Sequence, residues 1–365
     1  MAQAITHDLS ADFDLTIADI DDEHLHHLGS QCKVPTQHTD LADPNAIREL
    51  VKDFDIVVGA IPGSLGYQMV QSVIEAGKPL VDISFCPEDV LNLDSLAKKQ
   101  RVPAIVDIGV APGMSNLILG HHYAMGMQVE SFVCYVGGLP VERKWPYAYK
   151  APFSPIDVIE EYTRPARIKR HGKIITLPAL SERERLHFDT IGELEAFNTD
   201  GLRTLLFTLD VREMIEKTLR YPGHVELMEA MRHTGYFDTE PVDVNGQSIA
   251  PIDLTEKLLL PQWQLEDDEK EFTVMRVMIQ GVDKGKSVTY EYDLLDYRDP
   301  ETGLSSMART TGFTCTAAVR WLASGKVEDT GILPGELLAK DPEVLPFVFQ
   351  HLEARGVQWE KRLLD

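Results

Sequence analysis

An aspartate at the end of a short apolar strand is the residue with the clearest chemical meaning in this chain. Residues 13–22 read FDLTIADIDD, an alternating apolar stretch that runs into Asp19. In dinucleotide-binding sheets, a carboxylate at this place accepts hydrogen bonds from the ribose hydroxyls of NAD and repels a 2′-phosphate. Asp21 and Asp22 add to that repulsion. The pattern predicts NAD rather than NADP as the cofactor; the alternative is a solvated aspartate in an ordinary turn.

The segment before Asp19 holds only part of the unit that such a carboxylate should follow. The carboxylate should lie about 20 residues after a strand, a GxGxxG turn and a helix. Residues 1–9 (MAQAITHDL) are typical of the helix, with Ala2 in the place of the third small residue, and the first strand and first two glycines are missing. Their loss would remove the amides that hold a pyrophosphate and leave strand edges unpaired. We expect a misplaced start codon or a trimmed chain; the alternative is a variant that has lost cofactor binding.

Three further loops follow apolar strands, at residues 58–63, 82–85 and 109–113. Ligands of open α/β sheets bind beyond the carboxyl ends of the strands, so these loops should line the same cofactor. Ordinary strand–helix turns are the alternative. The predicted cofactor-binding residues are Asp19, Ala60, Ile61, Pro62, Ser84, Phe85 and Pro112.

Titratable side chains gather in later segments that are rich in Gly, Pro and Asn, mainly within 147–167 and 198–224. An amino-acid substrate needs a cation for its carboxylate and a base near the reacting amine. Each residue taken singly could instead form a surface ion pair. We predict Lys150 or His224 as the proton acceptor, with Asp200 orienting or substituting. The predicted substrate-binding residues are Tyr149, Arg203 and Arg309.

No metal site is predicted. His24, His26 and His27 lie close together, but only His24 and His27 could share a helix face, and no further ligands with suitable spacing accompany them. The acidic run at 266–271 lacks the alternating ligands and the glycine of a calcium loop. A solvated helix face and a solvated turn explain the two clusters.

The elements that would position these residues predict an α/β fold. Over residues 1–110, strand-period and helix-period stretches alternate, as in a Rossmann-type doubly wound parallel sheet, here lacking its first strand. We expect strands over 13–18, 31–36, 55–60, 79–84 and 103–108, and helices over 43–53, 64–76 and 93–101.

After Pro112-Gly113 the pattern changes to α+β with antiparallel strands over 130–140 and on both sides of 283–286. Helical patterns follow over 312–324 and 335–355. The expected domains are an N-terminally incomplete dinucleotide-binding domain (1–115), a substrate and dimerisation domain (116–308), and C-terminal helices that return to the first domain (309–365).

Composition excludes several classes of partner. The net charge of −23 over 365 residues repels nucleic acid and anionic membranes. The four cysteines form no CxxC pair, which indicates a reducing compartment, and no apolar run approaches the roughly 18 residues of a membrane span. We expect a cytoplasmic protein that binds a small amino-acid substrate and forms a homodimer or a higher homo-oligomer.

An ordered series of motifs resembles the saccharopine dehydrogenase-like family, and within it the lysine 6-dehydrogenases. The series comprises VVGAIPG (57–63), LVDISF (80–85), DIGVAPGMSNLILG (107–120), YVGGLP (135–140), SPIDVIEEYTRPAR (154–167), NTDGLRTLL (198–206), LRYPGH (219–224) and ARTTGFT (308–314). The resemblance implies NAD-dependent oxidation of the ε-amino group of L-lysine to 2-aminoadipate 6-semialdehyde, ammonia and NADH. The alternatives are a saccharopine reductase-type or other amine or imine oxidoreductase of the family, and a non-catalytic member without the phosphate-binding loop.

Overall fold

The computed structural model describes residues 1–151, 155–266 and 269–364. It divides into two compact units, each made of several stretches of chain. Unit 1 consists of Met1–Met127, Arg203–Leu209 and Ala308–Gln358. Unit 2 consists of Gln128–Leu202, Asp210–Met307 and Trp359–Asp365. The domain boundaries expected after residues 115 and 308 stay a prediction.

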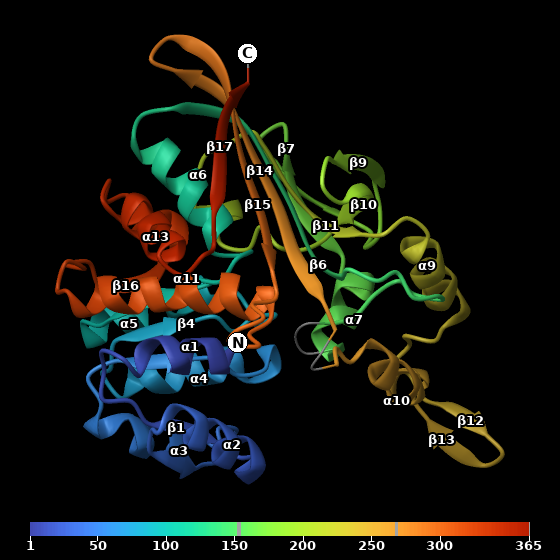
Figure 1. The fold of residues 1–365 in the computed structure, drawn as a ribbon, viewed down its shortest axis with the longest axis horizontal. Coiled ribbons are helices and arrows are strands. Elements are labelled where there is room, and N and C mark those ends of the chain that lie inside the picture. The colour runs from blue at the N-terminus through green and yellow to red at the C-terminus, as the bar shows by residue number, and fades with distance from the viewer. Residues whose placement is uncertain (152–154, 267–268, 365) are drawn as a thin grey trace. The chain divides into compact units, whose positions relative to one another are not determined.

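Four parallel strands form the main sheet of unit 1 (Figure 1). In spatial order they are β16 (Gly331–Pro334), β5 (Pro103–Val106), β4 (Leu80–Asp82) and β3 (Val57–Gly59). All residues of β4 and β16 are buried, which agrees with the uninterrupted apolar runs of a sheet covered on both faces.

A second, two-stranded parallel sheet carries Asp19. It pairs β1 (Ile17–Asp19) with β2 (Thr36–His38). Within the described part of the chain, no strand pairing joins this sheet to β3. Nucleotide-binding sheets have the strand order 3-2-1-4-5-6. In unit 1, β2 and β1 correspond to strands 3 and 2, and β3, β4 and β5 correspond to strands 4, 5 and 6. No strand corresponds to strand 1 among the described residues, and β16 adds a strand beyond β5. The predicted Rossmann-type sheet is confirmed.

The strand expected over 31–36 is wrong in its position. The helix α2 (Asp22–Cys32) occupies the first two of these residues, and β2 begins only at Thr36. The helix ends because Lys33 adopts the left-handed conformation, with φ of 55°. All three residues of β2 are exposed, so the strand has no apolar pattern that the sequence could reveal.

Helices surround the strands of unit 1. They are α1 (Ala2–Leu9), α2, α3 (Pro44–Leu50), α4 (Gly63–Glu75), α5 (Asp94–Gln100), α6 (Met114–Ala124), α8 (Leu205–Thr208), most of α11 (Ser306–Ala323), α12 (Gly335–Leu338) and α13 (Val344–Glu353). Two short 3-10 helices, η1 (Val51–Asp53) and η2 (Val90–Leu93), join them. Apolar side chains of α3, α4 and α5 share one core with β4, β5 and β16.

A larger, mostly antiparallel sheet forms unit 2. Along its main path the order is β17 (Trp359–Leu364), β15 (Lys286–Tyr297), β14 (Glu271–Asp283), β6 (Gln128–Pro140), β11 (Glu213–Arg220), β10 (Gly192–Asn198) and β9 (Glu184–Phe188). β7 (Ala166–Arg170) pairs with β11 and with β8 (Lys173–Leu177), and β12 (Val242–Val244) and β13 (Gln247–Ile249) form a separate hairpin.

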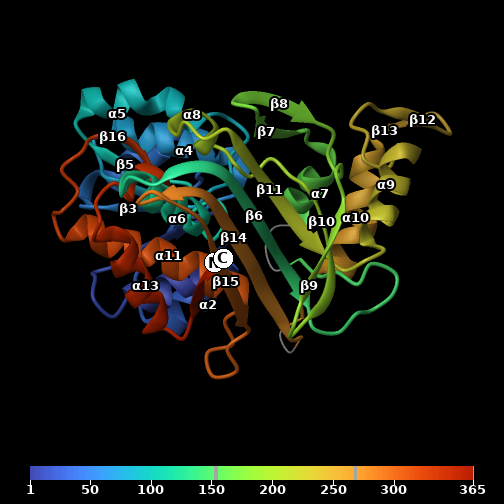
Figure 2. The same ribbon diagram turned by 90° about the horizontal axis from the view of Figure 1, so that it is seen from above.

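Three helices of unit 2 share an apolar core with this sheet (Figure 2). They are α7 (Pro155–Thr163), α9 (His224–Thr234) and α10 (Pro251–Trp263). Their buried side chains meet Phe197 of β10 around the indole of Trp263, which is fully buried. The strands expected over 130–140 and on both sides of 283–286 are confirmed by β6, β14 and β15. The C-terminal helices are followed by a strand, β17, that the sequence did not reveal.

Candidate functional site

Asp19 lies at the carboxyl end of β1, as predicted. Its carbonyl oxygen accepts a hydrogen bond from the amide of Thr39 at 2.9 Å, and its Oδ1 accepts one from the amide of Asp21 at 3.1 Å. The carboxylate is only partly buried. It therefore has room to accept hydrogen bonds from a ribose diol, and in this respect the residues fit a dinucleotide.

The other predicted cofactor residues lie in loops at the carboxyl ends of neighbouring strands. Ala60, Ile61 and Pro62 join β3 to α4, Ser84 and Phe85 follow β4, and Pro112 follows β5. Since these three strands are parallel neighbours, their carboxyl ends share one edge of the sheet. The first two loops touch closely: a Cβ built on Gly63 would lie 2.3 Å from the carbonyl oxygen of Phe85. The structure thus brings together the two predicted cofactor loops that follow β3 and β4.

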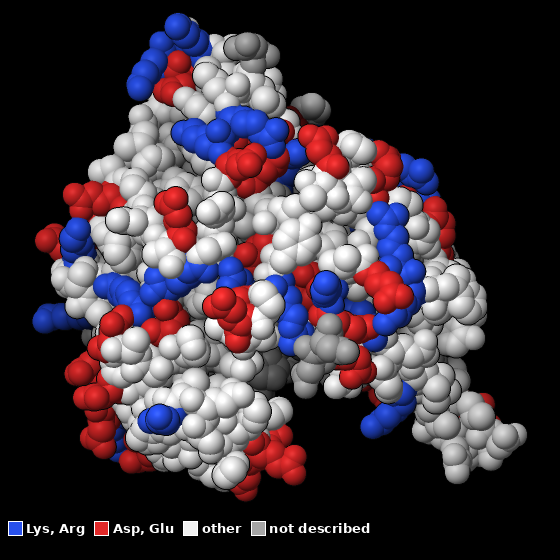
Figure 3. Space-filling model, in the orientation of Figure 1, with Lys and Arg blue, Asp and Glu red and all other residues white. Residues whose placement is uncertain are grey.

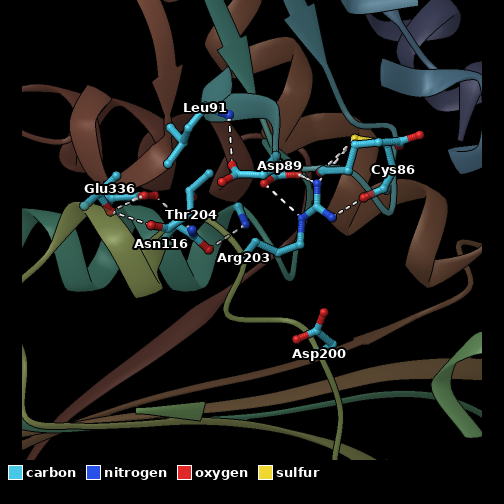
Figure 4. A network of polar contacts seen from close by, with 12 residues as sticks. Cys86, Asp89, Leu91, Asn116, Asp200, Arg203, Thr204 and Glu336 are labelled. Carbon is cyan, nitrogen blue, oxygen red and sulfur yellow. Dashed lines mark hydrogen bonds and ion pairs between the residues drawn. The ribbon is translucent and has the colours of Figure 1, made fainter. Parts of the chain in front are cut away.

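Arg203, predicted to bind substrate, is buried in unit 1 (Figure 4). Its Nε and Nη2 donate to the carboxylate of Asp107 at 3.2 Å, and its Nη1 donates to the carbonyl oxygen of Cys86. The guanidinium also lies 4.8 Å from the centroid of the Phe85 ring. A carboxylate of the same unit therefore already neutralises this cation, and its role in binding a substrate carboxylate stays a prediction.

Asp82 ends the apolar strand β4 and begins the predicted cofactor loop 82–85, but it is not among the predicted cofactor-binding residues; its carboxyl group is buried. Its Oδ1 accepts a hydrogen bond from the hydroxyl of Ser84 at 2.8 Å. Burial, aided by the negative charge of Asp107, raises the pKa of Asp82 to about 8. The group is therefore protonated at neutral pH and places a neutral carboxyl beside the predicted cofactor loop.

A second buried carboxyl, Glu336, holds the short stretch Arg203–Leu209 in unit 1 (Figure 4). The Nδ2 of Asn116 donates to Glu336 at 2.9 Å and the hydroxyl of Thr208 donates to it at 2.6 Å. Burial raises the pKa of Glu336. This carboxyl joins α12, α6 and α8, so its role is to position α8.

In unit 2, His224 and Tyr149 belong to a buried aromatic cluster around Arg220. The guanidinium of Arg220 lies 4.3 Å from the centroid of the Tyr149 ring and donates to Glu161 at 2.5 Å. The ring of His224 forms hydrogen bonds through both nitrogens, Nε2 with the hydroxyl of Tyr162 at 2.9 Å and Nδ1 with the carbonyl oxygen of Tyr147 at 2.9 Å. The structure therefore brings together two of the predicted residues.

Burial and the charge of Arg220 lower the pKa of His224 to about 3. The imidazole is therefore neutral at physiological pH and is a weak proton acceptor. Burial raises the pKa of both Tyr149 and Tyr162 above the usual range of a phenol, so both keep their protons.

Lys150 and Asp200, the other candidates for proton transfer, are each paired within unit 2. The ammonium of Lys150 donates to the carbonyl oxygen of Gln264 at 2.8 Å and lies 3.3 Å from Glu269. The carboxylate of Asp200 accepts two hydrogen bonds from the guanidinium of Arg167, at 2.9 and 2.8 Å, and a third from its backbone amide. Among the residues that the structure describes, no hydrogen bond joins either side chain to His224, and their catalytic roles stay predictions.

Glu216 of β11 is a further buried carboxyl that the sequence did not reveal. It accepts a hydrogen bond from the hydroxyl of Thr199 at 2.9 Å, and a Cβ built on Gly201 would lie 2.1 Å from its Oε2. Burial raises the pKa of Glu216 to about 7, assisted by the charges of Glu161 and Asp200. A carboxyl with this pKa can gain and lose a proton at working pH, as a general base must.

Arg309 lies in α11, in unit 1, and is largely buried. Its Nη2 donates to the carbonyl oxygen of Arg355 at 3.1 Å, and its guanidinium lies 5.8 Å from the centroid of the Phe313 ring. The division of the chain thus assigns Arg203 and Arg309 to unit 1, and Tyr149, Lys150, Asp200 and His224 to unit 2.

Among the described residues, no group of three or more His, Cys, Asp or Glu side chains is arranged to hold a metal ion. None of the helices in this part of the chain is long and apolar enough to cross a lipid bilayer. His24, His26 and His27 are exposed side chains of α2.

The parallel sheet of unit 1, with a carboxylate and loops at its strand ends, defines a Rossmann-like unit for a nicotinamide dinucleotide. Two family models cover nearly all of the chain. "Saccharopine dehydrogenase NADP binding domain" matches residues 1–105, and "Saccharopine dehydrogenase C-terminal domain" matches residues 109–357. The chain belongs to the saccharopine dehydrogenase family, as its motifs predicted.

Curated relatives carry several names. Saccharopine dehydrogenase [NADP(+), L-glutamate-forming] of Schizosaccharomyces pombe is 21% identical in an alignment of 400 positions, which covers 89% of this chain and 88% of the relative. Carboxyaminopropylagmatine dehydrogenase of Synechocystis is 24% identical, over 87% of this chain and 83% of the relative. Alpha-aminoadipic semialdehyde synthase of Arabidopsis thaliana is 27% identical, but the match spans only 20% of that protein. None of these three is named a lysine 6-dehydrogenase.

A solved structure shares the fold. Apo saccharopine dehydrogenase (L-Glu forming) from Saccharomyces cerevisiae superposes with a TM-score of 0.79 at 21% identity, covering 100% of this chain and 97% of that chain.

Proposed function

We propose that the protein is an NAD-dependent dehydrogenase that oxidises the ε-amino group of L-lysine. L-Lysine, NAD and water would give 2-aminoadipate 6-semialdehyde, ammonia, NADH and a proton. Bound NAD supplies the acceptor for the hydride that leaves the ε-carbon. The chain's own residues would orient the amine, take its proton and exclude bulk water.

The pairing of arginines with carboxylates carries the choice of lysine as substrate. Three arginines in the predicted substrate segments each bind a carboxylate of their own unit, in the pairs Arg167–Asp200 at 2.8 Å, Arg203–Asp107 at 3.2 Å and Arg220–Glu161 at 2.5 Å. Their charges are therefore already neutralised. Saccharopine has three carboxylates and requires several unneutralised cations, whereas lysine has one carboxylate and two amines. The net charge of −23 also favours a cationic amino acid.

The proton acceptor belongs to unit 2 in this proposal. Lys150 and His224 remain the assigned acceptors, with Asp200 orienting the amine. We add Glu216, because its pKa of about 7 suits a proton acceptor better than the pKa of about 3 of His224. Tyr149 and Arg309 are proposed to contact the substrate.

The names of the relatives support a second candidate, an NADP-dependent reaction on saccharopine that forms L-glutamate. A coupled measurement separates the two. NADH absorbance and ammonia release are followed with NAD and L-lysine at mildly alkaline pH, and NADPH absorbance with NADP and L-saccharopine. Product in the first reaction alone supports lysine oxidation. Product in the second alone assigns the saccharopine reaction, and no product in either favours another amine or imine substrate or a non-catalytic role.

The assignment of the base has its own test. Lys150→Met together with His224→Gln should lower kcat/KM for lysine by about a hundredfold or more, the usual contribution of general base catalysis. Lys144→Met is the matched control, because Lys144 also pairs with Glu269, at 2.8 Å, without being assigned to the site. A double variant that keeps nearly full kcat/KM would show that neither group is the base.

We also propose a homodimer, in keeping with the expected oligomer. The edge strand β17 leaves Leu363 58% exposed, and an open edge can pair with another chain. Light scattering on the purified protein tests this proposal.

A further inference from the structure

The turn after β1 links Asp19 directly to the start of α2. The amide of Asp21 donates to Asp19, and Asp21 then caps the helix with its own carboxylate. Its Oδ1 accepts hydrogen bonds from the amide of Glu23 at 2.9 Å and from the amide of His24 at 3.0 Å. These are the N–H groups that a helix start would otherwise offer to an anion, such as a phosphate on the ribose that Asp19 is predicted to hold.

The stretch of chain around this turn also carries few cations. The first lysine of the chain is Lys33 and the first arginine is Arg48. Lys33 lies at the opposite end of α2, and Arg48 is bound to Glu75 at 2.7 Å. In Figure 3, acidic side chains gather along the edges of the region that α2 and α3 occupy.

Two imidazoles near the turn are paired with its carboxylates. His24 Nδ1 lies 3.5 Å from Asp21 Oδ2, and His38 Nδ1 lies 2.8 Å from Asp22 Oδ1. A 2′-phosphate would therefore meet several carboxylates, helix amides that are already bonded, and histidines that are already paired. NADP, which the family description names, does not fit these residues at its 2′-phosphate.

We infer that Asp21 is a specificity-determining residue that excludes NADP, because its carboxylate occupies the amide site that a 2′-phosphate would need. This inference rests on the proposed use of a nicotinamide dinucleotide and adds a second acidic determinant to Asp19. Asp19 binds the ribose hydroxyls, and Asp21 removes the anion site beside them.

Calorimetric titration of the full chain with NAD and NADP tests the inference without any turnover. ADP-ribose and its 2′-phosphate serve as probes of the adenosine end alone. We expect NAD to bind at least about fiftyfold more tightly than NADP, since several carboxylates oppose the phosphate and no free helix amide binds it. Asp21→Gly frees the two amides and removes the charge, and it should reduce this ratio by about tenfold. Asp21→Asn keeps the cap and removes only the charge, and it should reduce the ratio less.

Asp43 provides a matched control. It caps α3 with the same backbone conformation, φ and ψ of −94° and 112° against −93° and 107° at Asp21, and its Oδ1 accepts from one amide, that of Asn45 at 2.9 Å, where Asp21 accepts from two. Asp43→Gly also removes a helix cap and one negative charge and should leave the ratio unchanged.

Three results would overturn the inference: equal or tighter binding of NADP by the unaltered protein, an unchanged ratio in Asp21→Gly, or an equal change in Asp43→Gly. Binding of neither dinucleotide would refute the inference and the proposed function together. Selective binding of NAD without oxidation of lysine would refute only the proposed function.

Discussion

Replacement of Glu216 by glutamine should change how the stability of the protein depends on pH. Burial raises the pKa of this carboxyl from 4.5 to about 7, so the folded protein holds the proton more tightly than the unfolded chain. The stabilisation that the bound proton provides is complete below the unfolded pKa and is lost as pH rises through the folded one. A shift of this size corresponds to roughly 3 kcal/mol of unfolding free energy, most of it lost between about pH 4.5 and 7.

Glu216→Gln keeps an oxygen that can accept from the Thr199 hydroxyl, but it cannot ionise. Its free energy of unfolding should therefore exceed that of the unaltered protein by an amount that grows by roughly 3 kcal/mol from acidic to mildly alkaline pH. Urea unfolding at a series of pH values, followed by tryptophan fluorescence and circular dichroism, measures this difference. The difference between the two proteins isolates Glu216 from Asp82, whose pKa of about 8 gives the same direction of change.

A second variant sharpens the test. Thr199→Val removes a hydrogen bond that favours the ionised form of Glu216, so the loss of stability should move to higher pH. A difference between Glu216→Gln and the unaltered protein that stays constant across the whole pH range would refute the claim that this buried carboxyl is protonated.

Three further predictions concern unit 1. Arg203→Met should lower the unfolding free energy by about 3–5 kcal/mol, because it leaves the buried carboxylate of Asp107 without its cation. A double variant that also changes Asp107→Leu should recover most of this loss, as measured by urea unfolding. Burial alone would raise the pKa of Asp8, but hydrogen bonds from His351, Thr316 and Arg355 and the charge of Arg355 hold it well below its usual range. Asp8→Asn should therefore cost about 2–4 kcal/mol at pH 7 and progressively less as the pH falls toward the folded pKa. Gly63→Ala should lower the thermal midpoint by several degrees, since its Cβ would lie 2.3 Å from the carbonyl oxygen of Phe85. An unchanged midpoint would show that the loops after β3 and β4 can separate at no cost.

Much of unit 1 could be predicted because its strands are local apolar runs. Residues 55–60, 79–84 and 103–108 carry the pattern of a buried parallel sheet in their own sequence, and the structure confirms β3, β4 and β5 there. Asp19 was recognisable for the same reason, since its position at a strand end is a local property. β17 was not, because WEKRLL is largely polar and becomes a strand through its pairing with β15.

The partners of charged residues could not be predicted in this way. Arg203 stands in a polar, glycine-containing motif that is typical of a binding loop, yet its carboxylate partner Asp107 is 96 positions away in the sequence. Glu216 lies in a strand, and only the elements that cover that strand make its carboxyl buried and its pKa high. Charge pairing and desolvation depend on the whole topology, so a local sequence pattern does not determine them.

The interleaving of the two units has a consequence for synthesis of the protein on the ribosome. Unit 1 begins with the first residues, but its sheet is complete only when β16, at Gly331–Pro334, pairs with β5. Until those residues emerge, the nascent chain presents β5 as an open edge, and such edges promote aggregation. We therefore expect slow folding after translation, a need for chaperones during expression, and insoluble products from any truncation before Gly331.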